Sequence, residues 1–82
     1  MDDGEILSKI AVIVADVVDL ETVELTPGTI ADDIEGWDSL AHVRIVVAVE
    51  EEFHCKFMTK EITALKCVGD FVALVKRYQV SA

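Results

Sequence analysis

Three side chains near the middle of the sequence have the chemical types of a hydrolase triad: the carboxylate of Asp38, the hydroxyl of Ser39 and the imidazole of His42. In such a triad the imidazole takes the proton of the hydroxyl, and the carboxylate holds the imidazole in place. Here the carboxylate and the hydroxyl are adjacent in the chain, and no Gly-x-Ser-x-Gly turn surrounds the serine. Hydrolysis is therefore a remote alternative, and we expect His42 to be a partly buried, hydrogen-bonded residue.

Neither an EF-hand loop nor a zinc-site pattern fits this sequence. Several acidic residues lie in the same region, but aligning Gly36 with the glycine of an EF-hand loop puts Ala31 at the first ligand position and His42 at the last. Cys55 and Cys67 form no Cys-x-x-Cys pair and have no zinc-ligand spacing to a histidine. We predict neither a metal site nor a disulfide scaffold.

The size of the chain limits what kind of site it can hold. With 82 residues and 9.0 kDa it predicts a single domain over 1–82, with its core at about 5–78. Hydrophobic residues make up 52% of the chain, which is enough for a packed core. A core of this size contributes only about 3–5 kcal/mol of net stability and leaves little room for an enclosed active site, which argues against an enzyme.

The net charge of −9 indicates which partners to expect. It argues against nucleic acid and anionic membranes and favours basic proteins. The acids are unevenly placed, because residues 1–38 hold eleven of the 16 and a single base, Lys9. The acidic start, Met1-Asp2-Asp3, is unlike a signal peptide, and no apolar run approaches the ~18 residues of a membrane span. We expect a cytoplasmic monomer.

The hydrophobic periodicity predicts an all-α fold, a small four-helix bundle with three longer helices and one short one. A long loop, over 19–36, follows the first helix and carries a Thr-Pro-Gly turn. Thr59 is predicted to cap the short helix, which would hold Ile62 and Leu65 above a core position for Phe57 and Met58. The longer helices are predicted over 5–18, 39–53 and 68–78.

The helix predicted over 39–53 has two apolar stripes. One stripe contains Ile45, Val46, Val49 and Phe53, with His42 among them, and we expect it to face the core. The other contains Leu40, Val43 and Val47, and it is flanked by the charged residues Arg44, Glu50 and Glu51. An apolar stripe with a charged rim is typical of a docking surface, although burial between helices is the open alternative.

Ser39 stands where the long loop becomes this helix. On its own, Asp38-Ser39 is explained by helix capping. The wider pattern, an acidic domain with Trp37-Asp38-Ser39-Leu40 at the start of a helix that ends in Glu50-Glu51-Glu52-Phe53, resembles the acyl carrier protein family and its peptidyl carrier relatives. The resemblance covers about 5–78, and Val68-Gly69-Asp70-Phe71 is a weaker echo of it.

The resemblance implies a carrier that performs no chemistry itself. Ser39 would hold a covalent 4′-phosphopantetheine, whose thiol carries acyl groups as thioesters. Asp38 would assist the phosphopantetheinyl transferase that installs the group from coenzyme A. The other partners would be enzymes that load, condense and tailor acyl or aminoacyl groups, and a phosphate on Ser39 would suit the positive end of a helix.

The chain also departs from the common fatty acid carriers that it resembles. Those carriers are strongly acidic along the second helix, whereas Ala41, His42 and Arg44 occupy it here. We therefore expect a specialised pathway that makes a polyketide, a modified lipid or a hybrid product. Trp37 keeps an aminoacyl cargo open, and housekeeping fatty acid synthesis and an unmodified interaction domain are further alternatives.

Overall fold

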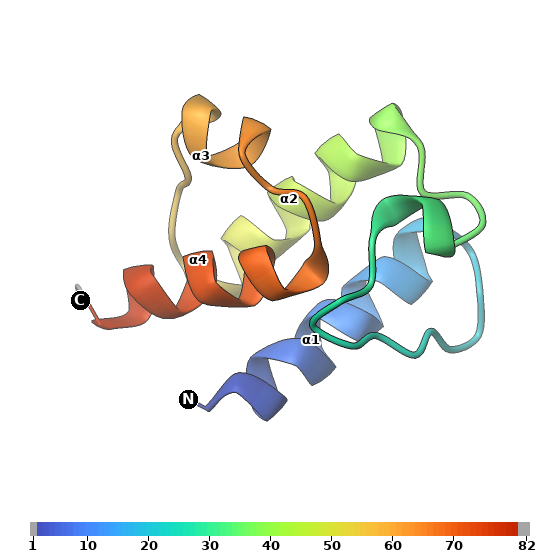
Figure 1. The fold of residues 1–82 in the computed structure, drawn as a ribbon, viewed down its shortest axis with the longest axis horizontal. Coiled ribbons are helices and arrows are strands. Elements are labelled where there is room, and N and C mark those ends of the chain that lie inside the picture. The colour runs from blue at the N-terminus through green and yellow to red at the C-terminus, as the bar shows by residue number, and fades with distance from the viewer. Residues whose placement is uncertain (1, 81–82) are drawn as a thin grey trace.

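A computed structural model describes residues 2–80 of the chain, and within that range it contains helices and loops but no strand. The elements, shown in Figure 1, are α1 (Asp3–Val17), the one-turn 3-10 helix η1 (Ala31–Asp33), α2 (Ser39–Phe53), α3 (Thr59–Thr63) and α4 (Val68–Val80). The helix α1 packs against both α2 and α4. The predicted all-α architecture is confirmed, with each longer helix within about two residues of its predicted limits.

Each of the first two long helices begins at an aspartate that caps it. The Asp2 side chain accepts a hydrogen bond from the Glu5 backbone N–H at 2.8 Å, and Asp38 does the same for the Ala41 N–H at 2.8 Å. Such caps satisfy backbone donors that have no partner within the helix. At its other end α2 stops at His54, whose φ of 53° is left-handed and reverses the chain.

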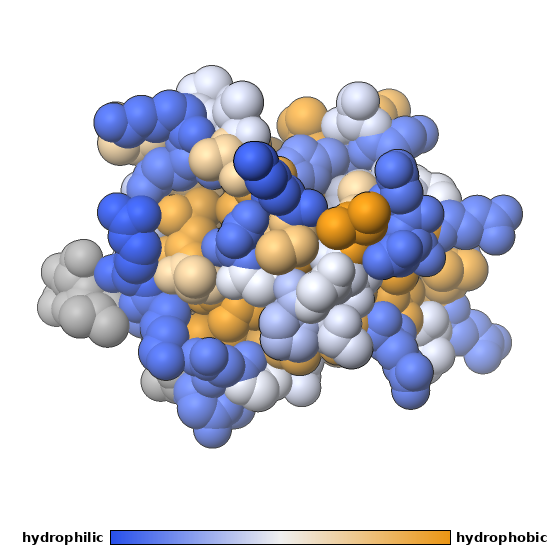
Figure 2. All heavy atoms as spheres, in the orientation of Figure 1, coloured by the Kyte–Doolittle hydropathy of each residue, from blue (hydrophilic) through white to orange (hydrophobic). Residues whose placement is uncertain are grey.

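The core forms where the apolar stripes of the three long helices meet. Its most deeply buried side chains are mainly β-branched and include Ile6, Ile10, Val14, Ile45, Val49, Val68, Phe71 and Val75. Phe57 lies edge-on to Phe71, with 6.1 Å between the ring centroids. Polar side chains cover most of the face shown in Figure 2, and apolar atoms are visible between them. No helix within residues 2–80 is long and apolar enough to cross a membrane.

The loop between α1 and α2 is tied to the beginning of α4. The Val68 N–H donates to the Thr29 carbonyl at 2.8 Å, and the Gly69 N–H donates to the Pro27 carbonyl at 2.7 Å. Without these carbonyls, the N–H groups at the start of α4 would need a capping side chain as their hydrogen-bond acceptor. Because the loop supplies the acceptors, α4 can follow Cys67, which is a poor capping residue. A Cβ atom on Gly69 would lie 2.7 Å from the Pro27 oxygen, so glycine permits the contact.

The region around α3 differs from the prediction in three respects. The N-cap is Met58 and not Thr59, because the Glu61 carboxylate accepts the Met58 N–H at 2.9 Å. Met58 was expected in the core but is exposed, and only Phe57 is buried there. The helix ends at Thr63, so Leu65 lies in the connection to α4. A helix of five residues is too short for its period to decide which side chains face inward.

Candidate functional site

Ser39 is the first residue of α2, and its side chain is exposed to solvent. Because the Asp38 side chain caps the helix, the Ser39 hydroxyl is not needed for that purpose. The hydroxyl therefore stands at the positive end of a helix of 15 residues, where a covalently attached phosphate is electrostatically favoured. This exposed position fits 4′-phosphopantetheine, although the Asp38 carboxylate would repel the phosphate once it is attached.

Trp37 and His42 form a contact beside Ser39. The indole Nε1–H donates to His42 Nδ1 at 3.2 Å, and the two rings are stacked with centroids 6.2 Å apart. The contact requires an unprotonated Nδ1, and burial lowers the pKa of His42 from its ordinary value. The expected partly buried, hydrogen-bonded histidine is confirmed. Within residues 2–80 no hydrogen bond joins His42 to Ser39, so the pair lacks the geometry of a catalytic base and nucleophile.

A cavity of about 40 Å³ lies behind this pair of rings. It lies between the first turn of α2 and the start of α4. Its lining includes Trp37, His42, Leu65, Cys67 and Phe71. Its volume is far below the ~300 Å³ at which pockets for small-molecule ligands begin. This cavity is therefore too small to serve as a substrate pocket.

The second stripe of α2, which we call the α2 strip, consists of Leu40, Val43 and Val47. These side chains are 63%, 58% and 47% exposed, respectively. On the opposite face Ile45 and Val49 are completely buried. The expectation that one stripe faces the core and the other faces solvent is confirmed, and the alternative that both are buried is wrong.

The charged residues around the α2 strip have different surroundings. Arg44 and Glu51 are exposed, as a rim requires. Glu50 is half-buried, and its carboxylate accepts the Phe57 backbone N–H at 2.8 Å. This hydrogen bond fixes the connection that follows α2, a role that the sequence did not reveal.

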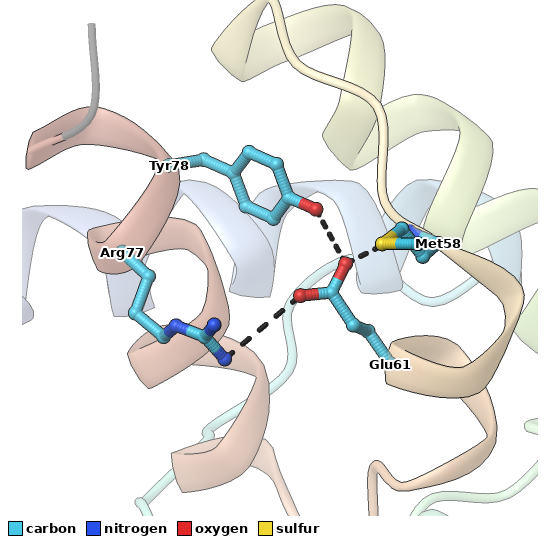
Figure 3. A network of polar contacts seen from close by, with 4 residues as sticks. All are labelled: Met58, Glu61, Arg77 and Tyr78. Atoms are coloured by element: carbon cyan, nitrogen blue, oxygen red, sulfur yellow. Dashed lines mark hydrogen bonds and ion pairs between the residues drawn. The ribbon is translucent and has the colours of Figure 1, made fainter.

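A polar network between α3 and α4 was also missed by sequence reasoning. Figure 3 shows the Glu61 carboxylate accepting hydrogen bonds from the Tyr78 hydroxyl and the Met58 N–H, and Arg77 Nη1 lies 3.8 Å from its other oxygen. The bond from Tyr78 is the main cause that lowers the pKa of Glu61, and the same bond raises the pKa of Tyr78. The partners lie 17 residues apart, so no local motif indicates the network.

The surroundings of Cys55 do not favour a reactive thiol. Burial, followed by the nearby charge of Glu50, raises the pKa of the Cys55 thiol, which disfavours the nucleophilic thiolate. Both cysteines are free and half-buried. Within the part of the chain that the structure describes, no three histidine, cysteine or acidic side chains are grouped to hold a metal ion.

Comparisons with known proteins agree on one kind of relative. Residues 8–75 match the family model described as a phosphopantetheine attachment site. An acyl carrier protein of Acidothermus cellulolyticus is 38% identical over 79 residues, which cover 95% of this chain and 93% of that protein. A solution NMR structure of the holo acyl carrier protein of Geobacter metallireducens superposes with a TM-score of 0.83 at 36% identity, covering 92% of this chain and 86% of that one.

A more specialised relative is similar to the same degree. The meromycolate extension acyl carrier protein of Mycobacterium tuberculosis is 34% identical over 76 residues, which are 92% of this chain. The match spans only 65% of the length of that protein. Similarity in sequence therefore does not separate a general carrier from a specialised one.

Proposed function

The chain belongs to the acyl carrier protein family, and from this premise we propose that it carries acyl intermediates as thioesters on 4′-phosphopantetheine attached to Ser39, in a specialised biosynthetic pathway. Family members are carriers and not catalysts, and phosphopantetheine supplies the thiol on which other enzymes act. The carrying role and the cofactor follow from the family. The attachment residue, the pathway and the partner surface are our proposal.

The exposure of Ser39 at the start of α2 carries this proposal. A transferase needs an accessible hydroxyl, and a swinging arm needs a rigid base. The Asp38 cap and the buried face of α2 provide that rigidity, since the helix is anchored to the core by Ile45 and Val49. Asp38 has a structural role as the cap and, in our proposal, a second role in the transfer reaction.

The surface of α2 supports a specialised pathway. The first turns of α2 present Leu40, Val43 and Arg44, so a partner meets apolar side chains and a cation before it meets the acidic residues at the end of the helix. We propose that loading, condensing and tailoring enzymes dock on the α2 strip, and that Arg44 and Glu51 select among them. The cargo could be an acyl group of a polyketide or modified lipid, and an aminoacyl cargo is the second candidate.

The direct test is modification by a phosphopantetheinyl transferase with coenzyme A and magnesium, followed by intact mass spectrometry. The wild type should gain the mass of one phosphopantetheine, and Ser39→Ala should gain none. Ser8→Ala is a matched control, because Ser8 is an exposed serine on α1 and its variant should be modified normally. Since Asp38 and not Ser39 caps α2, the Ser39→Ala protein should keep its helical circular dichroism.

A further variant separates the two roles of Asp38. Asparagine is an equally good N-cap, so Asp38→Asn should preserve the fold while slowing the transfer reaction. If the folded wild type stays unmodified with several transferases of broad specificity, the proposal fails and an unmodified interaction domain becomes the better explanation. Thioester hydrolysis by the unmodified protein would instead support the hydrolase.

A further inference from the structure

Ser39 is held in place by its neighbours and not by its own side chain. The residue is exposed, and within residues 2–80 its hydroxyl makes no hydrogen bond. Its position therefore depends on how the loop enters α2. The backbone of this entry is held by the Trp37 N–H, which donates to the Ile34 carbonyl at 3.2 Å, and by the Asp38 N–H, which donates to the Gly36 carbonyl at 3.1 Å.

Two side-chain contacts complete the entry to α2. Asp38 is the N-cap, and its carboxylate accepts the Ala41 N–H. Trp37 precedes the cap and His42 is the fourth residue of the helix, so their contact spans the cap. A contact between these two positions, known as a hydrophobic staple, sets the angle at which a chain enters a helix. In this staple the rings stack, and the Trp37 indole N–H also donates to His42 Nδ1.

The hydrogen bond of this staple exists only while His42 is neutral. Nδ1 accepts in the neutral imidazole but donates in the imidazolium, so a proton there would set two donors against each other. Within residues 2–80 no ion pair would compensate the new charge. The charged and titratable groups on α2 and on the elements around His42 are Asp32 and Asp33 of η1, Glu35, the cap Asp38, Arg44, Lys66 and Cys67 at the cavity, and Asp70 of α4. Burial lowers the pKa of His42, so the staple is intact at neutral pH and is lost as the pH falls.

We propose that His42 is a positioning residue for the modification of Ser39, and that protonation of His42 slows this modification by releasing Trp37 from the entry to α2. The inference rests on the proposed attachment of phosphopantetheine to Ser39. His42 does not act on the hydroxyl itself, because within residues 2–80 no hydrogen bond joins the two side chains. It holds the loop, so that a transferase meets Ser39 in one arrangement and not in many.

Loss of the staple should change the binding of the carrier more than the chemical step. The transferase would then have to select the fraction of molecules in which the start of α2 is correctly placed. The apparent affinity falls by that fraction, whereas the bound complex reacts as before. Since the net contribution of one hydrogen bond corresponds to about a two- to tenfold change, KM for the carrier should rise by that factor at nearly constant kcat.

The test measures the kinetics of phosphopantetheine transfer to the full chain, with coenzyme A, magnesium and a transferase of broad specificity. His42→Phe and Trp37→Phe each keep a ring but remove one partner of the hydrogen bond, so each should raise KM, and the double variant should be no worse than either. His42→Asn should restore the wild-type KM, because its Oδ1 is attached to Cγ, as Nδ1 is in histidine, and accepts the indole N–H. Ile10→Val is the control, because it removes a buried methylene of α1 and lowers stability but should leave KM unchanged.

The pH profile separates this positioning role from a purely structural one. At low carrier concentration, the ratio of the rates for the wild type and His42→Asn cancels the pH dependence of the transferase, since the same enzyme modifies both. The ratio should be constant above a pH of about 6.5, the pKa of an unperturbed histidine, and should fall by about two- to tenfold at lower pH. Its midpoint should coincide with that of the indole ¹H–¹⁵N signal of Trp37, the only tryptophan.

Several results would overturn the positioning role of His42. They are a wild-type KM for His42→Phe and Trp37→Phe, an equal rise in KM for Ile10→Val, a failure of His42→Asn to restore the KM, and a rate ratio that does not change with pH. A fall in kcat at constant KM would instead assign His42 to the chemical step. In all these outcomes the wild type is still modified, so the proposed function stands. If the wild type is not modified at all, the proposed function fails and this inference fails with it.

Discussion

Replacing Val47 by Asp should leave the fold intact, whereas the same substitution at Val49 should unfold it. Val47 is 47% exposed, so only about half of its side chain is removed from water. Full burial of such a side chain contributes roughly 1.5–3 kcal/mol, so the substitution at Val47 should cost about 1 kcal/mol. Glu50 and Glu51 follow three and four residues later, and their repulsion adds roughly 0.2–0.5 kcal/mol.

Val49 is completely buried, so an aspartate there would place an unpaired carboxylate in the core. The penalty of several kcal/mol exceeds the roughly 3–5 kcal/mol that a core of this size supplies. Thermal melts followed by circular dichroism distinguish the two outcomes. The melting temperature of Val47→Asp should fall by about 4–8 °C per kcal/mol lost, and Val49→Asp should show no cooperative transition.

The same pair of variants tests the proposed docking role of the α2 strip. Val47→Asp should slow acyl loading by the cognate enzyme far more than its small loss of stability explains, because the contact that it removes is intermolecular. If Val47→Asp unfolds, the strip belongs to the core and the reasoning is refuted. If it loads at the wild-type rate, the strip is exposed but does not dock the enzyme.

Three other predictions concern Gly69, His42 and Arg44. Gly69→Ala should cost roughly 1–3 kcal/mol in urea denaturation, because its Cβ would meet a loop carbonyl at 2.7 Å, whereas Gly28→Ala, with nothing within 4 Å, should be neutral. Burial lowers the pKa of His42 in the folded protein. The contribution of neutral His42 to the stability of the protein is therefore complete above the pKa of the unfolded state, about 6.5. This contribution is lost as the pH falls through the lower pKa of the folded state. The fluorescence of Trp37, the only tryptophan, should therefore titrate with a midpoint below about 6.5, and no such transition should remain in His42→Gln. Arg44→Glu should weaken the cognate partner and improve recognition by fatty acid synthase enzymes, and unchanged steady-state kinetics with both would contradict the specialised pathway.

The sequence predicted α2 and the position of Ser39 well because the information there is local. A run of 15 residues repeats its apolar positions often enough to establish both the helix and its two faces. Asp38 marks the beginning of the helix because aspartate is a strong capping residue. The position of the candidate attachment residue could therefore be predicted without any knowledge of tertiary contacts.

The parts that sequence reasoning missed depend on contacts between distant segments. The carbonyl of Pro27 replaces a capping side chain for α4, although it lies about 40 residues before Gly69. The partner of Glu61 is Tyr78, on another helix, and Glu50 binds the backbone of Phe57 beyond the end of its own helix. No periodicity or local motif reports such pairs. They appear only once the helices are packed.

The arrangement of the helix ends has a consequence for how the protein can be joined to others. The beginning of α1 and the end of α4 lie on one side of the bundle, and the beginning of α2 lies on the other (Figure 1). The first pair of ends lies close together because α1 packs against α4, and an exposed ion pair joins Asp3 to Lys76 at 2.8 Å. A tag, a linker or a neighbouring domain fused at either terminus would therefore leave the Ser39 side unobstructed. The domain is therefore suited to function either as a separate protein or as one of several domains linked in tandem.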